Sequence, residues 1–208
     1  MKEPKKPLIS IVVITFNSSK YVLETLESAK AQTYQNIELI VTDDCSVDNT
    51  LSVCTEWIKK NKNRFTRTEI ISVEKNTGIV PNLNRGLNAV KGEWIKFIAG
   101  DDRLNDNCIE RFYEEVYQNS EIEVIFSNVS VNGIDIPEDY LPKFFLLETK
   151  EQYLNLLKGN SLPAPAFFIK STTLKQLNGF DEQFPFLDDY PLFIKILKSG
   201  RKLYYVND

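Results

Sequence analysis

The 208-residue sequence contains no histidine. This absence excludes catalytic triads in which histidine is the base, and it excludes metal sites built on imidazole ligands within these residues. The three cysteines, Cys45, Cys54 and Cys108, are odd in number and widely spaced, which indicates neither a disulfide framework nor a zinc site. Acid–base and metal chemistry would therefore have to come from carboxylates.

The sequence also lacks an excess of positive charge and any long apolar run. It has 25 lysines and arginines against 29 aspartates and glutamates, a net charge of -4, so no broad positive field exists to hold nucleic acid. A membrane-spanning helix needs roughly 18 consecutive apolar residues, and a signal peptide needs a shorter apolar run near the N-terminus. Neither run is present. We therefore expect a cytoplasmic protein that does not bind nucleic acid.

Apolar strand-like runs alternate with amphipathic helical patterns along the first part of the chain. Leu8 to Ile14 is a continuous run of the kind found in buried parallel strands, and Val22, Leu26 and Ala29 recur at helical spacing after it. The predicted strands cover residues 8–14, 37–41, 69–73, 94–98 and 123–127, and the predicted helices start near Ser18 or Ser19, Asp48, Pro81 and Asn107. Repeated βα units predict an α/β, Rossmann-like fold, with a mainly parallel central sheet and helices on both faces.

The regular alternation of predicted strands and helices ends after residue 128. Residues 129–148 are predicted to be irregular, followed by a short helix near 152–157, a strand at 166–169 and an apolar helix over 192–197. At 208 residues the chain is long enough for one well-packed domain and short for two. We expect a single domain.

Polar residues follow three of the predicted strands. Thr15–Asn17 follow the first strand, Asp43 and Asp44 with Ser46 follow the second, and Gly100–Asp102 follow the fourth. In open parallel sheets, ligands bind beyond the carboxyl ends of the strands. We therefore expect these residues to meet in one acidic site.

The adjacent carboxylates of Asp101 and Asp102 point to a metal. Two such groups at the end of an apolar strand repel each other, and each needs a cation or several hydrogen-bond donors to stay ionised. Magnesium or manganese held by one or two carboxylates commonly completes its shell with phosphate oxygens of a substrate. The pair therefore favours Mg²⁺ or Mn²⁺ together with a nucleoside diphosphate.

Several short motifs occur in a fixed order from the first strand almost to the C-terminus. They are residues 9–17, 41–46 with Asp48 and Thr50, Asn76 to Gly78 with Asn84 and Gly86, residues 91–93, 100–102 and 179–181, and Asp188-Asp189. Together they resemble glycosyltransferase family 2, whose members have the GT-A fold and use nucleotide sugars. The resemblance implies one GT-A domain over residues 1–208, with a nucleotide-binding half at 1–128 and an acceptor-side half at 129–208 that is shortened at its C-terminal end.

The resemblance also assigns the nucleotide-binding residues. They are Thr15, Phe16, Asn17, Asp44, Asn76, Gly78 and Asp101. Thr15 and Phe16 would line the base pocket, although core packing stays open for Phe16. Asp44 would accept a hydrogen bond from a ring N–H, which uracil, thymine and guanine possess and adenine and cytosine lack. UDP-sugars are therefore favoured over dTDP- or GDP-sugars.

Two positions depart from the family pattern. The metal motif is commonly Asp-x-Asp followed by a further Asp, and Ala99 stands at its first position. The resemblance then leaves Asp102 as metal ligand and Asp101 as contacting ribose or metal, with Mn²⁺ or Mg²⁺ as cofactor. Many relatives carry a basic residue facing the diphosphate where this chain has Leu83, for which Arg85 or Lys75 could compensate.

Asp189 corresponds to the catalytic base of the family. It would accept the proton of an acceptor hydroxyl during direct displacement, which inverts the anomeric configuration. Asp188 could instead serve as the N-cap of the following helix. The resemblance further implies a glycan or lipid-linked sugar acceptor, assembly of bacterial surface polysaccharide, and peripheral association with the inner face of the membrane.

Other classes of protein stay open. A nucleotide-binding or interaction domain with little or no catalytic activity is favoured by Ala99, Leu83 and the end of the chain at Asp208, because family members usually continue further. A dinucleotide-dependent dehydrogenase would show G-x-G-x-x-G after the first strand, and this chain does not. A nucleotidyltransferase would ordinarily show a glycine-rich basic loop at the same place.

Overall fold

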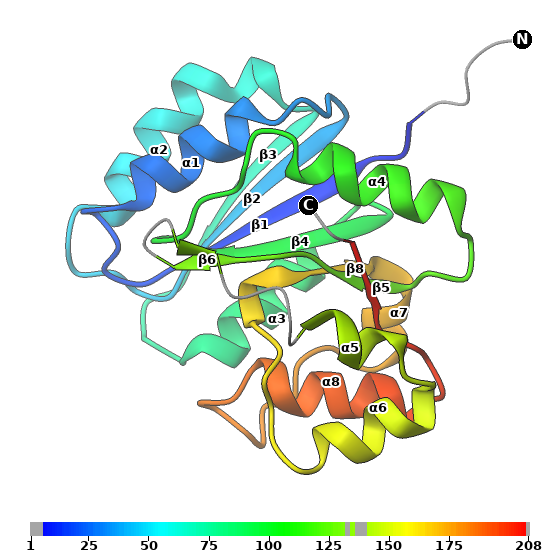
Figure 1. Ribbon diagram of the computed structural model, residues 1–208. Coiled ribbons are helices and arrows are strands. Elements are labelled where there is room, and N and C mark those ends of the chain that lie inside the picture. The colour runs from blue at the N-terminus through cyan, green and yellow to red at the C-terminus, as the bar shows by residue number, and fades with distance from the viewer. Residues whose placement is uncertain (1–5, 132–133, 136–140, 207–208) are drawn as a thin grey trace, which may run out of the picture.

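The structure is a computed structural model that describes residues 6–131, 134–135 and 141–206. A seven-stranded sheet with the order β3-β2-β1-β4-β8-β5-β9 runs through it (Figure 1). Its strands are β1 (Ile9–Thr15), β2 (Ile37–Asp43), β3 (Arg67–Ser72), β4 (Trp94–Ala99), β5 (Val124–Phe126), β8 (Phe167–Lys170) and β9 (Tyr204–Tyr205). The expected α/β architecture with a mainly parallel sheet is confirmed.

The parallel part of the sheet consists of β3, β2, β1 and β4. Thr15 of β1 lies opposite Asp43 of β2, and Ile14 lies opposite Ala99 of β4. β1, β2 and β4 are mostly apolar and almost completely buried, as expected for strands covered on both sides, whereas β3 at the edge of the sheet is only partly buried. Their carboxyl ends therefore stop at the same edge of the sheet, side by side.

The other part of the sheet is mixed. β8 runs antiparallel to both β4 and β5, and β9 runs parallel to β5. β4 and β8 pair only at Trp94 with Lys170 and at Ile95 with Ile169, after which the two strands diverge. Beyond this pairing, the Lys96 side chain connects β4 to the chain before β8, by donating to the carbonyls of Pro165 and Phe167.

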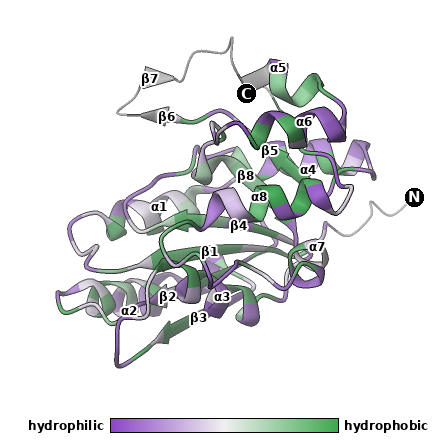
Figure 2. Cartoon of the chain, turned by 90° about the horizontal axis from the view of Figure 1, so that it is seen from below, coloured by the Kyte–Doolittle hydropathy of each residue, from purple (hydrophilic) through white to green (hydrophobic). Residues whose placement is uncertain are grey.

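Helices cover both faces of the sheet, and two separate hydrophobic clusters lie between helices and strands. One face carries α1 (Val22–Ala31), α2 (Thr50–Asn61) and α4 (Cys108–Gln118), and the other carries α3 (Ile79–Ala89), α5 (Leu141–Leu146), α6 (Thr149–Leu156), α7 (Ser171–Gln176) and α8 (Asp189–Lys198) (Figure 1). Figure 2 shows β1 and β4 as largely hydrophobic ribbons between these layers. The prediction of helices on both faces is confirmed.

Some local predictions are wrong. Ser18 and Ser19 do not cap α1, because the helix begins at Val22 and the Ser18 carbonyl instead accepts the Tyr21 and Val22 amides at 2.9 Å. Asp48 lies one residue before the N-cap position of α2, although its Oδ1 still accepts the Thr50 amide at 2.9 Å.

The segment 129–148 is not wholly irregular either. It contains α5 and the short ribbon of β6 (Ser130–Val131) and β7 (Ile134–Asp135). The helix α7 and the strand β9 also had no counterpart among the predicted elements.

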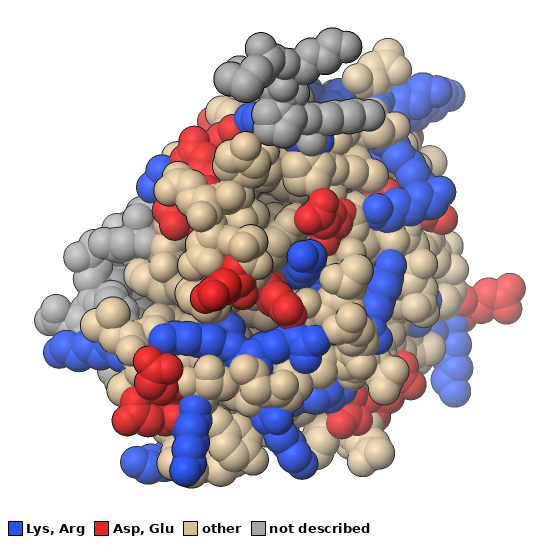
Figure 3. All heavy atoms as spheres, turned by 90° about the vertical axis from the view of Figure 1, so that its right-hand side faces the viewer, with Lys and Arg blue, Asp and Glu red and all other residues tan. Residues whose placement is uncertain are grey.

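Within the described residues no helix combines the length and hydropathy that crossing a bilayer requires. Acidic and basic side chains are interspersed over the face of the molecule shown in Figure 3.

A buried carboxylate joins the strands at the edge opposite the predicted site. Glu38 of β2 is fully buried and accepts hydrogen bonds from Ser10 Oγ at 2.6 Å, from the Lys91 and Gly92 amides at 2.6 and 2.9 Å, and from Arg67 Nη1 at 2.8 Å. Burial raises the pKa of Glu38, but these donors outweigh burial and bring the pKa below its ordinary value. Glu38 thus links β1, β2, β3 and the turn into β4.

Replacing Glu38 with alanine should destabilise the protein by about 3 kcal/mol at neutral pH, because Arg67 and two amides lose their buried partner. Glu69 also pairs with Arg67 but is 36% exposed, so Glu69→Ala should cost less than about 1 kcal/mol. Because the pKa of Glu38 is lowered on folding, its contribution is present above its ordinary pKa of 4.5 and is lost as pH falls through the folded value. Urea unfolding at pH 7 and in acid measures both effects, and equal stability of the two variants at pH 7 would contradict this role.

Candidate active site at the strand ends

The loops after β1 and β2 are joined into one wall. Thr15 Oγ1 donates to Asp43 Oδ1 at 2.8 Å, and the amide and hydroxyl of Ser46 donate to the same carboxylate at 2.8 and 2.5 Å. The Asn17 amide donates to Ser46 Oγ at 2.8 Å, and Asn17 Oδ1 accepts the Val47 amide at 2.9 Å. Asn17 adopts a φ of 50°, a conformation that asparagine tolerates better than most residues. Its side chain therefore shapes the loop from within.

Asp44 lies at the base of this wall and is 2% exposed. Its carboxylate accepts the Thr77 amide at 3.0 Å, Thr77 Oγ1 at 2.7 Å, the Gly78 amide at 2.7 Å and Arg85 Nη2 at 2.5 Å. Burial raises the pKa of Asp44, but the donors from Thr77, Arg85 and Gly78 outweigh it, so the pKa lies below its ordinary value. The loop that leads into α3 is thereby tied to the end of β2.

Of the other predicted nucleotide residues, Asn76 and Gly78 belong to this loop and Phe16 follows β1. Asn76 is exposed, and Gly78 has a φ of 95° that favours glycine at the start of α3. Phe16 is 49% exposed, so the alternative of core packing is wrong for this residue. A half-exposed aromatic ring beside a polar wall is available to stack on a planar ligand.

Asp101 and Asp102 follow β4 and sit against the end of β1. The Gly100 amide donates to the Ile14 carbonyl at 2.9 Å, and a Cβ on Gly100 would lie 2.9 Å from Thr15 Cγ2. Asp101 is exposed and Asp102 is half-buried. Burial and the Asp101 charge raise the pKa of Asp102 above its ordinary value, against a smaller lowering by Lys96. The pair therefore carries negative charge that the surrounding residues do not fully compensate.

This donor set fits a hard divalent cation that is shared with a ligand. No group of three or more histidine, cysteine or acidic side chains that could hold a metal occurs among the described residues. Two carboxylates are nevertheless enough for Mg²⁺ or Mn²⁺ when diphosphate oxygens complete the shell. Asp101 and Asp102 would hold such an ion together with the substrate.

Asp188 and Asp189 stand at the start of α8. Asp188 occupies the N-cap position but makes no side-chain capping bond, and burial followed by the Asp189 charge raises its pKa. Asp189 Oδ1 accepts the Tyr190 amide at 2.6 Å, and Oδ2 accepts Asn160 Nδ2 at 3.0 Å. The connection that leads into α8 lies on the same side of the molecule as the carboxyl ends of β1 and β4 (Figure 1).

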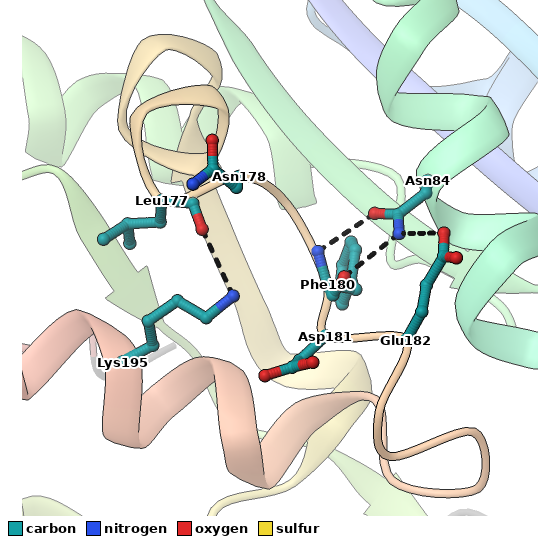
Figure 4. A pocket seen from close by; sticks show the side chains of 7 residues that line it. All are labelled: Asn84, Leu177, Asn178, Phe180, Asp181, Glu182 and Lys195. Carbon is teal, nitrogen blue, oxygen red and sulfur yellow. Dashed lines mark hydrogen bonds between the residues drawn. The ribbon is translucent and has the colours of Figure 1, made fainter.

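Contacts with α3 and its N-terminal Gly78 place the connection into α8 beside the loop that leads into α3. The Pro185 carbonyl lies 3.9 Å from the position of a Cβ on Gly78. Asn84 accepts the Phe180 amide at 2.9 Å through Oδ1 and donates to the Phe180 carbonyl and Glu182 Oε1, both at 3.0 Å (Figure 4). Asn84 and the Gly179-Phe180 motif therefore hold the segment that leads to Asp189.

A surface pocket of about 390 Å³ lies at this clamp (Figure 4). It is lined by Asn84, Leu177, Asn178, Phe180, Asp181, Glu182 and Lys195. None of the predicted nucleotide or metal residues lines it, so it is separate from the cluster at the strand ends.

The structure also shows the surroundings of Leu83, which departs from the family pattern, and of Arg85, which could compensate for it. Leu83 is 2% exposed and belongs to the hydrophobic core. Arg85 pairs with Asp44 and also donates from Nη1 to Thr77 Oγ1 at 2.8 Å, which sequence reasoning missed. In this structure its charge is committed to Asp44.

Asn84→Ala removes a two-point clamp and should cost about 2 kcal/mol, at about 1 kcal/mol per hydrogen bond lost. Glu182→Ala removes only the exposed bond to the same amide and should cost less than about 0.5 kcal/mol. Urea unfolding of the two variants compares them directly. Equal losses would show that the Phe180 bonds do not carry the clamp.

The sheet order, the covering helices and the polar strand ends define a GT-A type fold, the fold of nucleotide-diphospho-sugar transferases. The sequence model of glycosyl transferase family 2 matches residues 10–173. The chain belongs to this family.

Curated relatives are similar over different lengths. The chain is 36% identical over 121 residues to the glycosyltransferase GlyG of Streptococcus pneumoniae, a match that covers 58% of this chain and 38% of GlyG. It is 28% identical over 200 residues, 94% of this chain and 72% of the relative, to WfaP of Escherichia coli. WfaP is named a UDP-Glc:alpha-D-GlcNAc-diphosphoundecaprenol beta-1,3-glucosyltransferase.

Solved structures share the fold. TarS 1-349 of S. aureus in complex with UDP-GlcNAc has a TM-score of 0.75 at 22% identity, covering 96% of this chain and 58% of that chain. The mannosyltransferase PcManGT from Pyrobaculum calidifontis, in complex with GDP-Man and Mn²⁺, has a TM-score of 0.77 at 20% identity, covering 98% and 55%. At these identities the likeness establishes the fold alone.

Proposed function

We propose that this chain is a glycosyltransferase domain that moves a sugar from a UDP-sugar to an acceptor hydroxyl with inversion of configuration. The observation that carries the proposal is the convergence of Thr15, Asp44 and the Asp101-Asp102 pair at one sheet edge. The segment that leads to Asp189 passes beside this edge at Gly78. Family membership makes sugar transfer the chemistry to which such an edge is suited.

The donor nucleotide is proposed to lie along the wall formed by the loops after β1 and β2. Phe16 offers a half-exposed ring to the base, and Asp44 offers a carboxylate to a ring N–H. Thr15, Asn17, Asn76 and Gly78 would shape the pocket, and Asp101 would contact the ribose or the metal. Uracil is the proposed base, with thymine or guanine as alternatives, and the solved structures of TarS and PcManGT are complexes with UDP-GlcNAc and GDP-Man.

Asp189 is the proposed catalytic base. The Tyr190 amide and Asn160 Nδ2 orient its carboxylate at the first turn of α8. Asp189 would accept the proton of the acceptor hydroxyl as that oxygen attacks the anomeric carbon, while the bond from this carbon to the diphosphate breaks on the opposite side. A metal held by Asp102 and Asp101 would supply positive charge to the departing diphosphate.

The acceptor is proposed to be a glycan or a lipid-linked sugar in the assembly of bacterial surface polysaccharide. Support comes from WfaP, whose name gives a diphosphoundecaprenol-linked sugar as its acceptor. A cytoplasmic place, at the inner face of the membrane, would bring the chain to such an acceptor. The acceptor-side half, residues 129–208, would provide the acceptor surface.

A nucleotide-binding domain without transferase activity is the second candidate. The buried, apolar Leu83 and the two-carboxylate donor set at Asp101-Asp102 favour it, because both reduce the charge available to a departing diphosphate. Such a domain would bind UDP and release no sugar to any acceptor.

Thermal unfolding with UDP, dTDP, GDP and CDP, each with and without Mn²⁺, tests donor binding. UDP with Mn²⁺ should raise Tm most. A ligand at 100 times its Kd stabilises a protein by about 2.7 kcal/mol, which sets the scale of the effect. Mn²⁺ alone should change Tm little, because two carboxylates bind it weakly without the diphosphate. Asp102→Asn should lose the Mn²⁺-dependent increment, and Asp106→Asn, an exposed carboxylate in the same loop, should keep it. Absence of any nucleotide effect would overturn the proposed function.

Replacing Asp189 with asparagine should lower kcat for sugar transfer by about 10² to 10⁴ fold, because the general base is lost. The Kd for UDP should stay the same, since Asp189 acts on the acceptor. Asp181→Asn is the matched control, because Asp181 precedes α8 in the same segment and its Oδ1 accepts only a local amide bond, from Gln183 at 3.1 Å. Turnover of Asp189→Asn close to wild type would exclude the assignment.

A further inference from the structure

Donors from the protein itself fill the acceptor capacity of Asp44. A carboxylate offers about four lone-pair sites to hydrogen-bond donors. Four donors occupy them, namely the Thr77 amide, Thr77 Oγ1, the Gly78 amide and Arg85 Nη2. A base N–H can therefore reach this carboxylate only if one of the four donors leaves.

Two of these donors are backbone amides. The Thr77 and Gly78 amides belong to the short turn into α3, so moving them would require the turn to rearrange. The other two, Thr77 Oγ1 and Arg85 Nη2, are side-chain donors that rotamer changes can remove. Arg85 reaches Asp44 from the second turn of α3 through a long side chain that is 19% exposed, and among the four donors it alone carries a charge.

The resting position of Arg85 also leaves one of its own groups unsatisfied. Nη1 donates to Thr77 Oγ1 at 2.8 Å, and Nη2 donates to Asn82 Oδ1 at 3.1 Å as well as to Asp44. Nε is buried and has no hydrogen-bond partner within the described part of the chain. Release of the guanidinium would return this N–H to solvent, which lowers the cost of breaking the ion pair.

We propose that Arg85 is a latch on the base subsite: its guanidinium donates to Asp44 in this structure and is displaced by the ring N–H of the incoming base. The latch rests on the proposed function. It makes base binding an exchange of one donor for another at Asp44. Uracil N3–H can take the place of Nη2, whereas cytosine has an unprotonated N3 and cannot donate there. Arg85 would thus set an affinity threshold that every base must exceed, while Asp44 distinguishes bases that have a ring N–H from those that lack one.

Calorimetric titration with uridine tests the latch without interference from phosphate charge. Arg85→Met removes the competing donor and should tighten uridine binding about tenfold, the scale of one charge-assisted hydrogen bond. Cytidine should bind weakly to both forms. Lys91→Met removes the same charge from an exposed side chain beyond the C-terminal end of α3, so it should leave the Kd for uridine unchanged.

Arg85→Lys provides a second variant in case Arg85→Met does not fold. The shorter ammonium cannot donate to Thr77 and Asp44 in the same forked geometry, so uridine should bind more tightly than to wild type. Equal Kd values for wild type and Arg85→Met would overturn the latch and leave the proposed function intact. Weaker uridine binding by Arg85→Met would also overturn it, by showing that Arg85 reads the base. Failure of every form to bind uridine or UDP would overturn the proposed function and the latch together.

Discussion

The parallel pairing of β1 with β2 on one side and β4 on the other is the constraint on which the rest of this structure depends. Neighbouring strands lie about 4.8 Å apart, so residues in register at the strand ends are held side by side. Thr15 lies opposite Asp43, and the ladder continues beyond both strands through bonds from the Asp44 amide to the Thr15 carbonyl and from the Gly100 amide to the Ile14 carbonyl. Backbone hydrogen bonds thus bring three separate loops to one place before any side chain contributes.

Glu38, Asp44 and Asp102 lie on these strands or just beyond them, and they differ in how far nearby donors and charges offset the effect of burial on the pKa. Glu38 and Asp44 each accept four or more hydrogen bonds, and the pKa of each lies below its ordinary value in spite of burial. For Asp102, burial and the Asp101 charge raise the pKa, and the lowering by Lys96 does not offset them. Glu38 and Asp44 hold neighbouring segments together by hydrogen bonds at opposite ends of the strands. Asp102 retains an unmet demand for positive charge, which is the property of a cation site.

A few long-range polar contacts add to the β4–β8 pairing and the shared hydrophobic core that join the second half of the chain to this frame. Lys96 of β4 is 2% exposed and donates to the carbonyls of Pro165 and Phe167, where β4 and β8 no longer pair. Asn84 holds the Phe180 backbone from the other face. A buried ammonium needs defined partners, and the partly buried Asn84 amide has two on the Phe180 backbone, so these contacts help to fix where the chain passes on its way to Asp189.

Sequence by itself determined the alternation of strands and helices, the sheet edge at which the polar strand ends meet and the residues that end each strand. Those features are local, since hydrophobic period and strand-end polarity report the burial of each segment separately. The tertiary structure alone decided that β8 enters antiparallel between β4 and β5, that Phe16 is half-exposed and that Arg85 lies on Asp44. Each of these depends on contacts between residues far apart in the chain or on the packing around a side chain. The local sequence pattern does not specify which distant residue will form a hydrogen bond with a given group.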